Sequence, residues 1–202
     1  MFIIGITGGT GAGKTSALRA LRMLGALCLD CDAIYHELLS DNAELNADLG
    51  AAFNGVLSEG RVDRKLLGEI VFSDPAALLA LNSITHKYVS FEIERRLAAW
   101  EALNGKIAAI DAIALIESSR SEQCNVVVGV IAPRESRISR IMVRDGITRG
   151  QAELRINAQK PDSFFRERCD YILENTYSTS KDFERNCKKF FTQLIGGNSN
   201  AG

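Results

Sequence analysis

The chain has 202 residues, 46% hydrophobic and 24% charged, and its 24 basic and 25 acidic side chains give a formal net charge of −1. This composition predicts one globular domain with a full core and excludes a chain that is disordered as a whole. The charge balance argues against strong nonspecific binding to nucleic acid or membranes, and no apolar run reaches the roughly 18 to 20 residues of a membrane span. MFIIGI lacks the basic flank of a signal peptide, so we expect a cytoplasmic protein.

Short apolar runs alternate with longer amphipathic segments, a pattern typical of an α/β fold. A buried strand is predicted in MFIIGIT, followed by a helix over SALRALRML and a second strand in GALCLDCD. Residues 33–105 are almost wholly helical in pattern. Two helix starts are predicted in this segment, because Asp63 and Asp74 suit the cap position and Pro75 suits the first helical position.

The second half of the chain returns to strands in KIAAIDAIAL and NVVVGVIA. A basic helix is predicted over PRESRISRIMVRD, ended by Gly146, and Thr148 with Gln151 predicts a capping box for the next helix. A short strand in DYILEN precedes a last helix around SKDFERNCKKFFTQLI. The tail GGNSNAG has nothing to bury, and we expect it to be frayed.

Five cysteines, an odd number spread along the chain, favour reduced thiols over a disulfide framework. Cys28 and Cys31 form a C-x-x-C pair. A zinc or redox site needs a second ligand pair or a thioredoxin-like context, and neither is evident. We expect these two side chains to be apolar filler near a strand end.

A phosphate-binding loop is predicted between the first strand and the first helix. Gly8, Gly13, Lys14 and Thr15 fit the pattern G-x-x-x-x-G-K-[ST] in that context. Glycines let the backbone aim N–H groups at phosphate oxygens, and the helix adds its positive end. Lys14 is expected to reach the β- and γ-phosphates of a nucleoside triphosphate and the Thr15 hydroxyl to bind Mg²⁺. The alternative is a glycine-rich turn with chance spacing.

Acidic residues end two of the predicted strands, where parallel strands open into a ligand crevice. Asp32 is expected to orient an acceptor hydroxyl and take its proton during phosphoryl transfer. Asp30 is either a helix cap or an indirect support for magnesium, and a solvated cap is the alternative for Asp32 too. Asp111 ends IAAID, like an acid that holds a magnesium-bound water, with Glu117 as a weaker candidate. The alternative for Asp111 is a surface turn.

Arg137, Arg140 and Arg144 recur at three- and four-residue spacing and form one stripe on a helix, with Arg149 and Arg155 following beyond it. Such a stripe is usually a solvated face. In a chain that binds a triphosphate, arginines on a mobile helical lid can close over the transferring phosphoryl group and stabilise its charge. We expect Arg140, in mid-helix, to be the catalytic arginine, with Arg144 second.

The ordered set of motifs resembles the dephospho-CoA kinase family, whose members phosphorylate the ribose 3′-hydroxyl of dephospho-CoA in the last step of coenzyme A synthesis. The resemblance runs from GITGGTGAGKTS to ILEN and includes LDCDAI, EGRVDRKLLGEIVF, LNSITHK, RIMVRDGIT and RINAQ. The phosphate loop alone occurs in many families, but the ordered set is far more specific. It implies a P-loop nucleoside triphosphate hydrolase-like parallel sheet flanked by helices, ATP and Mg²⁺ as cofactors, and dephospho-CoA as substrate.

The resemblance, carried over by position, implies that residues 11–16 wrap ATP: Gly11, Ala12, Gly13, Lys14, Thr15 and Ser16. The loop pattern adds Gly8 to the expected nucleotide-binding residues. The resemblance further implies that Arg140 is a lid arginine at the phosphates, and Asn175 matches a late asparagine of the family that we assign to nucleotide binding.

On the acceptor side, the resemblance implies that Asp32 is the catalytic base and that Arg64 and His86 belong to a helical substrate-binding insertion. Asp111 is expected to lie at the acceptor crevice. By its own pattern, His86 is a core helix histidine more often than a ligand. Lys87 stands where the family usually has proline, and DAIALIE replaces a Pro-Leu-Leu-Phe-Glu-like segment, a change that touches the crevice beside Asp111.

Two other classes of phosphate-loop protein lack support in the sequence. A shikimate-kinase-like enzyme shares the loop and the Asp-x-Asp, but the chain has no Gly-Gly-Gly motif, and a GTPase would show Asn-Lys-x-Asp. A kinase of nucleoside monophosphates and a degenerate regulatory homologue remain alternatives. We expect one kinase domain with its core in about residues 1–31, 106–133 and 168–202, an acceptor-binding insertion in about 32–105 and a lid in about 134–167. No nucleic acid, membrane or obligate protein partner is expected.

Overall fold

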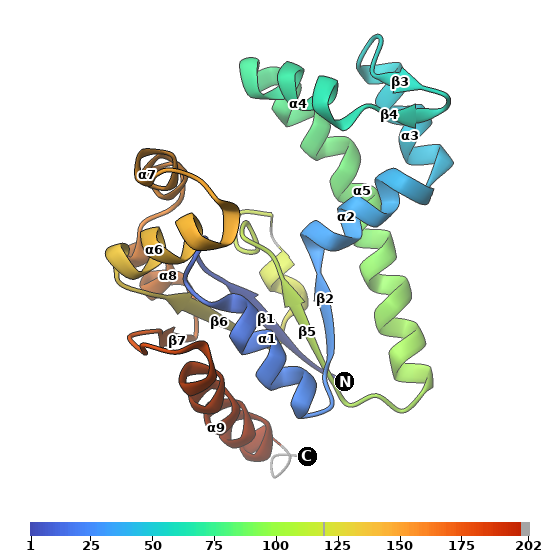
Figure 1. Ribbon diagram of the computed structural model, residues 1–202. Coiled ribbons are helices and arrows are strands. Elements are labelled where there is room, and N and C mark those ends of the chain that lie inside the picture. Colours follow the sequence, from blue (N-terminus) through green and yellow to red (C-terminus); the bar gives the residue numbers. More distant parts are fainter. Residues whose placement is uncertain (119, 199–202) are drawn as a thin grey trace. The chain divides into compact units, whose positions relative to one another are not determined.

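The computed structural model describes residues 1–118 and 120–198 and divides into two compact units (Figure 1). The sheet unit comprises Met1–Leu29 and Leu103–Gly202, and the helical unit comprises Asp30–Ala102. Within the described residues, no helix has the length and apolar character needed to cross a bilayer.

The sheet unit carries the strands and helices of the predicted α/β fold. In chain order these are β1 (Phe2–Thr7), α1 (Lys14–Met23), β2 (Leu27–Asp30, which ends at the unit boundary), β5 (Ile107–Asp111), a 3₁₀ turn (Arg120–Gln123), β6 (Val126–Ile131), α6 (Arg134–Asp145), α7 (Arg149–Asn157), α8 (Asp162–Arg168), β7 (Tyr171–Glu174) and α9 (Ser180–Asn198).

The five strands lie in the order β2-β5-β1-β6-β7. β1 pairs in parallel with β5 and β6, and β6 pairs in parallel with β7. The predicted parallel sheet flanked by helices is therefore confirmed. β5 is shorter than the run KIAAIDAIAL because it ends at Asp111, after which the chain forms turns.

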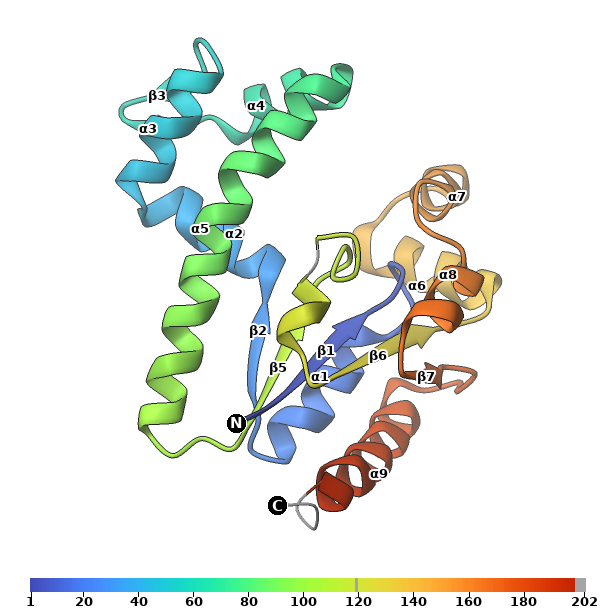
Figure 2. The same cartoon turned by 180° about the vertical axis from the view of Figure 1, so that it is seen from behind.

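One face of the sheet is covered by α1 and α9, which lie side by side in both views (Figures 1 and 2). Ile4 and Ile6 of β1 alternate toward this face, where they join Leu21 of α1 and Phe183 and Phe191 of α9 in one buried cluster. All five side chains are fully buried. This packing fixes β1 and the start of α1, and thereby the two ends of the loop between them.

Helices α6 and α7 share a small core of their own, formed by Ile138, Ile141, Ala152 and Ile156. The predicted stop at Gly146 is confirmed, with φ of 64° at the end of α6. The predicted capping box of Thr148 and Gln151 is also confirmed at the start of α7.

The helical unit contains four helices and a two-stranded hairpin within the described residues. Its elements are α2 (Cys31–Asp41), α3 (Ala43–Ala52), β3 (Leu57–Ser58), β4 (Arg61–Val62), α4 (Arg64–Ser73) and α5 (Pro75–Ala102). Leu45, Leu49 and Val56 are fully buried in its core. The predicted caps are confirmed: Asp63 Oδ1 accepts from the amide of Lys65 at 2.9 Å, and Asp74 Oδ1 accepts from that of Ala76 at 2.8 Å.

Two expectations about secondary structure were wrong. Residues 33–105 are not almost wholly helical, because β3 and β4 form an antiparallel hairpin in which Leu57 pairs with Val62. Its two-residue loop has positive φ at both Glu59 (51°) and Gly60 (77°), the geometry that matches strand twist. The tail is not frayed from its first glycine, since α9 continues to Asn198; the rest of the tail lies outside the described residues.

Candidate active site

The loop between β1 and α1, residues 8–13, takes its shape from three glycines. Gly8, Gly11 and Gly13 have φ angles of 135°, 77° and 116°, which L side chains rarely adopt. A Cβ atom on Gly8 would lie 2.1 Å from the carbonyl oxygen of Val130 in β6, so the loop packs directly on the neighbouring strand. α1 begins at Lys14 with no side-chain cap from any described residue, and its positive end therefore faces the loop.

Side chains bind the carbonyl oxygens of this loop. Lys14 Nζ donates to the carbonyl of Gly8 at 3.1 Å, and Asn175 Nδ2 donates to that of Ala12 at 2.8 Å. Asn175 is only 4% exposed and lies against Gly13, where a Cβ atom would be 2.4 Å from Nδ2. Because the C=O and N–H of a trans peptide point in opposite directions, fixing carbonyls on one side turns the following N–H groups to the other. Such a row of amides is an anion-binding nest.

Arg140 of α6 extends this set of carbonyl contacts. Its Nη1 donates to the carbonyls of Gly11 at 3.1 Å and Ala12 at 3.4 Å, and its Nη2 donates to that of Tyr177 at 3.3 Å. Burial lowers the pKa of this guanidinium below its usual range. The structure thus brings the predicted catalytic arginine to the phosphate loop, and its action on a phosphoryl group stays a prediction.

The arginine stripe of α6 is divided among three environments. Arg137 is only 5% exposed, Arg140 is half-buried, and the Arg144 side chain is 59% exposed. Arg144 Nε lies 2.7 Å from Asp145 Oδ1, and this hydrogen bond raises the pKa of Arg144. Arg137 therefore does not belong to a solvated face. Its contacts with the loop could not be predicted from the sequence.

Asp111 lies at the end of β5, in register with Ile6 of β1, and is 9% exposed. The surface-turn alternative is therefore wrong for this residue. Glu117, on the turn that follows, is exposed. The expected link of either acid to a magnesium-bound water stays a prediction.

A cleft of about 350 Å³ opens beside the loop in the sheet unit. Gly9, Glu117, Gln159 and Lys160 lie on its lining, which therefore carries one carboxylate, one amide and one ammonium group. Ile113 of the DAIALIE segment also lines this cleft, so the sequence departure noted above changes the wall of a cleft that borders the phosphate loop.

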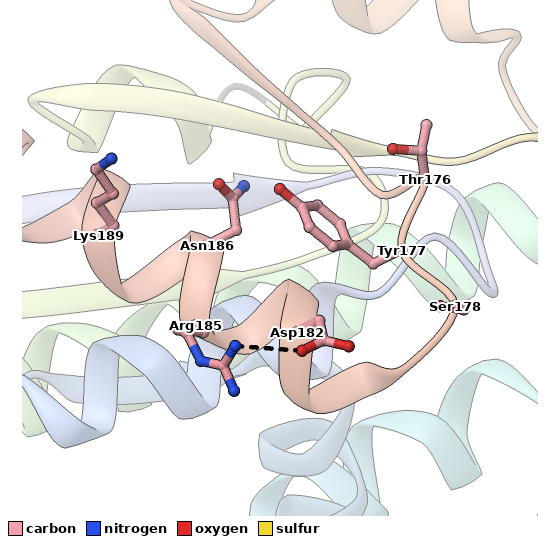
Figure 3. A pocket seen from close by; sticks show the side chains of 7 residues that line it. All are labelled: Thr176, Tyr177, Ser178, Asp182, Arg185, Asn186 and Lys189. Carbon is pink, nitrogen blue, oxygen red and sulfur yellow. Dashed lines mark hydrogen bonds and ion pairs between the residues drawn. The ribbon is translucent and has the colours of Figure 1, made fainter.

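A second cleft, of about 550 Å³, lies between α9 and the loop that follows β7 (Figure 3). Tyr177 and Asn186 face one another across it, and Lys189 lies one helical turn beyond Asn186 (Figure 3). Arg185 donates to Asp182 at 3.3 Å on the same helix. Tyr177 lines this cleft, and its carbonyl accepts from Arg140, which also binds the phosphate loop. The cleft therefore adjoins the contacts around the phosphate loop.

All five cysteines are free thiols. Cys28 donates to the carbonyl of Leu18, with 3.6 Å between Sγ and oxygen, and burial raises its pKa to about 11. Cys31 is buried. A thiol with so high a pKa carries almost no thiolate at neutral pH, which fits apolar filler better than redox chemistry.

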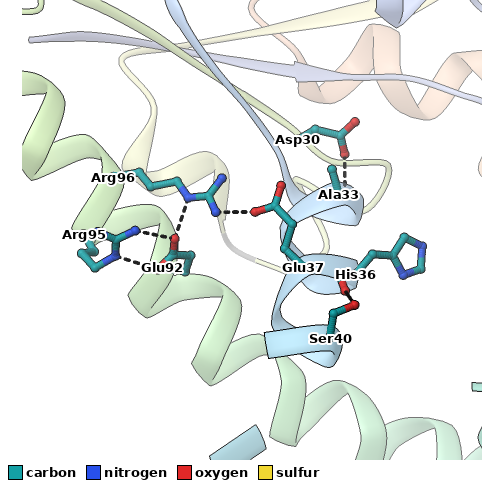
Figure 4. A network of polar contacts seen from close by, with 8 residues as sticks. All are labelled: Asp30, Ala33, His36, Glu37, Ser40, Glu92, Arg95 and Arg96. Carbon is teal, nitrogen blue, oxygen red and sulfur yellow. Dashed lines mark hydrogen bonds and ion pairs between the residues drawn. The ribbon is translucent and has the colours of Figure 1, made fainter. Parts of the chain in front are cut away.

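In the helical unit, the structure gives Asp30 and Asp32 different surroundings. Asp30 is the cap of α2: its Oδ1 accepts from the amide of Asp32 at 3.0 Å. The same oxygen accepts from the amide of Ala33 at 3.1 Å (Figure 4). The cap interpretation of Asp30 is therefore confirmed. Asp32 lies in the first turn of α2 and is exposed. Its expected role as a catalytic base stays a prediction.

Arg64 and His86, the two residues assigned to the helical acceptor-binding insertion, are both exposed. Arg64, the first residue of α4, places Nη2 2.8 Å from Nδ1 and 3.3 Å from Nε2 of His36 in α2. An in-plane hydrogen bond to one ring nitrogen would leave the other much farther away, so the guanidinium lies over the ring. His86, on α5, is exposed and is not the core histidine that its pattern alone favoured.

An ion-pair network connects α2 and α5 within this unit (Figure 4). Glu92 accepts from Arg95 Nε at 2.8 Å and from Arg96 Nε at 2.6 Å, and Arg96 also donates to Glu37 of α2. These hydrogen bonds, that from Arg95 first, lower the pKa of Glu92 to about 2. The network fixes α2, which carries Asp32, against the long helix of the same unit.

Comparisons with known proteins agree on one family. A family model described as dephospho-CoA kinase matches residues 2–181. A dephospho-CoA kinase of Geobacter sulfurreducens is 33% identical over 195 residues, which cover 96% of this chain and 98% of the relative.

Solved structures give the same picture for the fold. A crystal structure of a Thermus thermophilus protein is 34% identical and matches with a TM-score of 0.80, covering 96% of this chain and 97% of the other. A shikimate kinase of Bacteroides thetaiotaomicron matches with a TM-score of 0.56 at 13% identity, covering 96% and 98% of the two chains. At that identity the second likeness shows a shared fold alone.

Proposed function

The chain belongs to the dephospho-CoA kinase family, and from this membership we propose that it transfers the terminal phosphoryl group of ATP to the ribose 3′-hydroxyl of dephospho-CoA. The observation that carries the proposal is the glycine loop before α1, whose carbonyls are bound by Lys14, Arg140 and Asn175. A loop held in this way presents its amides to the phosphates of a nucleotide.

The nucleotide binds along residues 8–16. Lys14 carries a positive charge to the β- and γ-phosphates, and Ser16 and Asn175 support the loop around them. Thr15 is exposed at the first turn of α1, and one hydroxyl beside the phosphates fits Mg²⁺, which keeps several waters and takes few protein ligands. When bound with ATP, Mg²⁺ supplies positive charge that offsets the charge on the phosphates.

The acceptor is activated by Asp32. This carboxylate takes the proton of the 3′-hydroxyl as that oxygen forms a bond to the γ-phosphorus, while the bond from phosphorus to the ADP oxygen breaks. Arg64 and His86 of the helical unit bind the anionic acceptor, and Asp111 borders the reacting groups. Phosphoryl transfer thereby proceeds with Asp32 holding the proton that the acceptor loses.

The arginines of α6 stabilise the charge that develops during transfer. Arg140 acts at the phosphates, and Arg144 assists from the next turn of the helix. In this proposal residues 134–167 form the lid that closes over ATP, residues 32–105 bind the acceptor, and the remaining chain forms the core. ATP and dephospho-CoA are small cytoplasmic molecules, so the enzyme works in the cytoplasm and needs no nucleic acid, membrane or obligate protein partner.

The test is an acceptor panel. Purified protein is incubated with ATP, Mg²⁺ and one of dephospho-CoA, shikimate or a nucleoside monophosphate, and ADP release is followed while phosphorus NMR locates the new phosphate. We expect ADP release with dephospho-CoA and a 3′-phosphomonoester product. Turnover of another acceptor alone would indicate a different kinase, and nucleotide binding with no turnover would indicate a regulatory homologue.

A further inference from the structure

Thr10, in the middle of the phosphate loop, is bound at all three of its polar groups. Its N–H donates to Gln159 Oε1 at 2.9 Å, and its hydroxyl oxygen accepts from Gln159 Nε2 at 2.7 Å. Its carbonyl accepts from Arg137 Nε at 2.9 Å. Arg137 and Gln159 follow Thr10 by 127 and 149 positions in the sequence. The conformation of Thr10 is therefore set by side chains from outside the loop.

The two side chains that bind Thr10 also bind each other. Arg137 Nη2 donates to Gln159 Oε1 at 2.8 Å, and Arg137 Nη1 lies 3.6 Å from Asp162 Oδ1. Gly9 leaves the room for this pair, because a Cβ atom there would lie 2.3 Å from Arg137 Nη2. Burial disfavours the charged form of Arg137 and lowers its pKa, so its hydrogen bonds compensate for the loss of water.

Arg137 comes from α6 and Gln159 from the segment between α7 and α8, within residues 134–167. The three residues Thr10, Arg137 and Gln159 are called the Thr10 clasp below. Gln159 also lies on the lining of the cleft beside Gly9. The clasp is thus a direct connection between the loop and the predicted lid segment, made through hydrogen bonds that a nucleotide does not itself contribute.

We propose that Arg137 and Gln159 are positioning residues that hold the phosphate loop in its nucleotide-binding conformation before nucleotide arrives. This proposal rests on the proposed function, since it assigns a task to residues around the same loop. The Thr10 N–H is occupied by Gln159, and the Ala12 N–H donates to the carbonyl of Gly9 at 3.1 Å. The bound phosphates therefore rely on the amides of residue 11 and residues 13–15, and the clasp fixes the first half of the loop. Without the clasp, those amides are still present, but a smaller fraction of molecules has all of them oriented toward the phosphates at the same time.

A positioning role of this kind has a defined kinetic signature. When only a fraction of molecules is competent to bind, the apparent dissociation constant rises by the inverse of that fraction for every ligand that uses the site. The apparent dissociation constants of ATP and ADP are therefore expected to rise by the same factor. Saturating ATP restores the bound conformation, so kcat stays near the wild-type value while the KM for ATP rises.

The experiment compares Thr10→Val, Gln159→Ala, the double variant and Thr10→Ser. Titration calorimetry with ADP and steady-state kinetics with ATP are measured for each protein. Gln159→Ala removes three side-chain hydrogen bonds, and we expect it to weaken ADP binding about tenfold, at the lower end of their combined net contribution. Thr10→Val is expected to have a smaller effect and Thr10→Ser, which keeps the hydroxyl, almost none. The double variant is expected to bind ADP as Gln159→Ala does, because the two side chains act through the same contact.

Gln151→Ala is the matched control, because it removes a glutamine from the capping box at the other end of α7. It is expected to lower the melting temperature without changing ADP affinity. The proposal is overturned if Gln159→Ala binds ADP as tightly as wild type, if the effects of Gln159→Ala and Thr10→Val simply add, or if kcat falls while the KM for ATP is unchanged. ADP binding needs no acceptor, so a wild-type protein that fails to phosphorylate dephospho-CoA contradicts the proposed function and leaves this test intact.

Discussion

Asp30 Oδ1 accepts a hydrogen bond from the main-chain N–H of Asp32 at 3.0 Å, and through this bond Asp30 caps the helix α2 that carries Asp32. The cap satisfies amides that would otherwise lack a partner at the helix start. Asp32 is exposed within the first turn of α2, so its carboxylate is accessible, as a proton-accepting group must be.

Asp32→Asn is predicted to lower dephospho-CoA-dependent turnover by about 10²–10⁴-fold, because the amide keeps the shape of the side chain but cannot take a proton. ATP binding is expected to change little. The measurement is ADP release with dephospho-CoA beside ADP or ATP titration of the same preparations. Full activity in the variant would remove Asp32 from the mechanism.

Asp30→Asn is the matched control for that substitution, two residues away. Asparagine caps a helix about as well as aspartate, so both turnover and the melting temperature are expected to stay near wild type. Asp30→Ala, which removes the cap, is predicted to destabilise the protein by about 1 kcal/mol in urea unfolding. A large loss of turnover in Asp30→Asn would show that its charge, and not its cap, is what matters.

Lys14→Ala is predicted to abolish most ATP turnover and leave the protein folded. Its Nζ contacts the carbonyl of Gly8 at the loop surface and contributes little to the core, whereas the β- and γ-phosphates lose a point charge. ADP release and the melting temperature are measured on the same samples. Wild-type turnover in this variant would contradict the assignment of the loop to phosphate.

Arg140→Ala is predicted to lower kcat by roughly 10²-fold or more through loss of charge stabilisation at the phosphates. Because Arg140 also binds the carbonyls of Gly11 and Tyr177, we expect a smaller accompanying rise in the KM for ATP. Arg149→Ala, on the exposed surface of α7 and paired with Glu135, serves as the comparison. An Arg140→Ala enzyme within a factor of two or so of wild type would place Arg140 outside the catalytic step.

Glu92→Gln is predicted to make the stability of the protein less dependent on acid. The folded-state pKa of Glu92, about 2, lies below its usual 4.5 because Arg95 and Arg96 hydrogen-bond to the carboxylate. The free energy of unfolding that these hydrogen bonds to Glu92 contribute is fully present above pH 4.5 and is lost as pH falls toward 2. We expect a difference of about 1 to 2 kcal/mol between wild type and Glu92→Gln at neutral pH, allowing for solvent screening. Urea unfolding between pH 7 and pH 2 measures it, and a difference that stays constant over that range would contradict the assignment.

Features decided by neighbouring residues were predictable from the sequence. Asp63, Asp74 and the Thr148–Gln151 pair each cap a helix through side-chain contacts that span two or three positions. The glycine loop was predictable for the same reason, since its spacing and its position between a strand and a helix determine its shape. The family resemblance added the expected roles of residues that lie far apart.

Features decided by distant contacts were not predictable. Arg137 belongs to a stripe that reads as solvated, and only the folded chain shows that it binds the carbonyl of Thr10. Gln159 had one signal, its place at the end of RINAQ, and no local chemistry pointed to the loop. The hairpin of β3 and β4 was missed because its strands have two residues each and its loop, Glu59–Gly60, lacks the usual asparagine or aspartate.

The position of β1 between β5 and β6 has a consequence for synthesis of the chain. Ile4 pairs with Ala109 on one side and with Val126 on the other, so the first strand to leave the ribosome acquires neighbours only after more than half of the protein has been made. The helical unit, which is continuous from Asp30 to Ala102, can fold before the partner strands of β1 have been made. Asn175, which holds Ala12, is made later still. The loop near the amino terminus therefore gains its nucleotide-binding shape only after residue 175 has been made. We expect stalled nascent chains to bind immobilised ATP only when they extend beyond that residue.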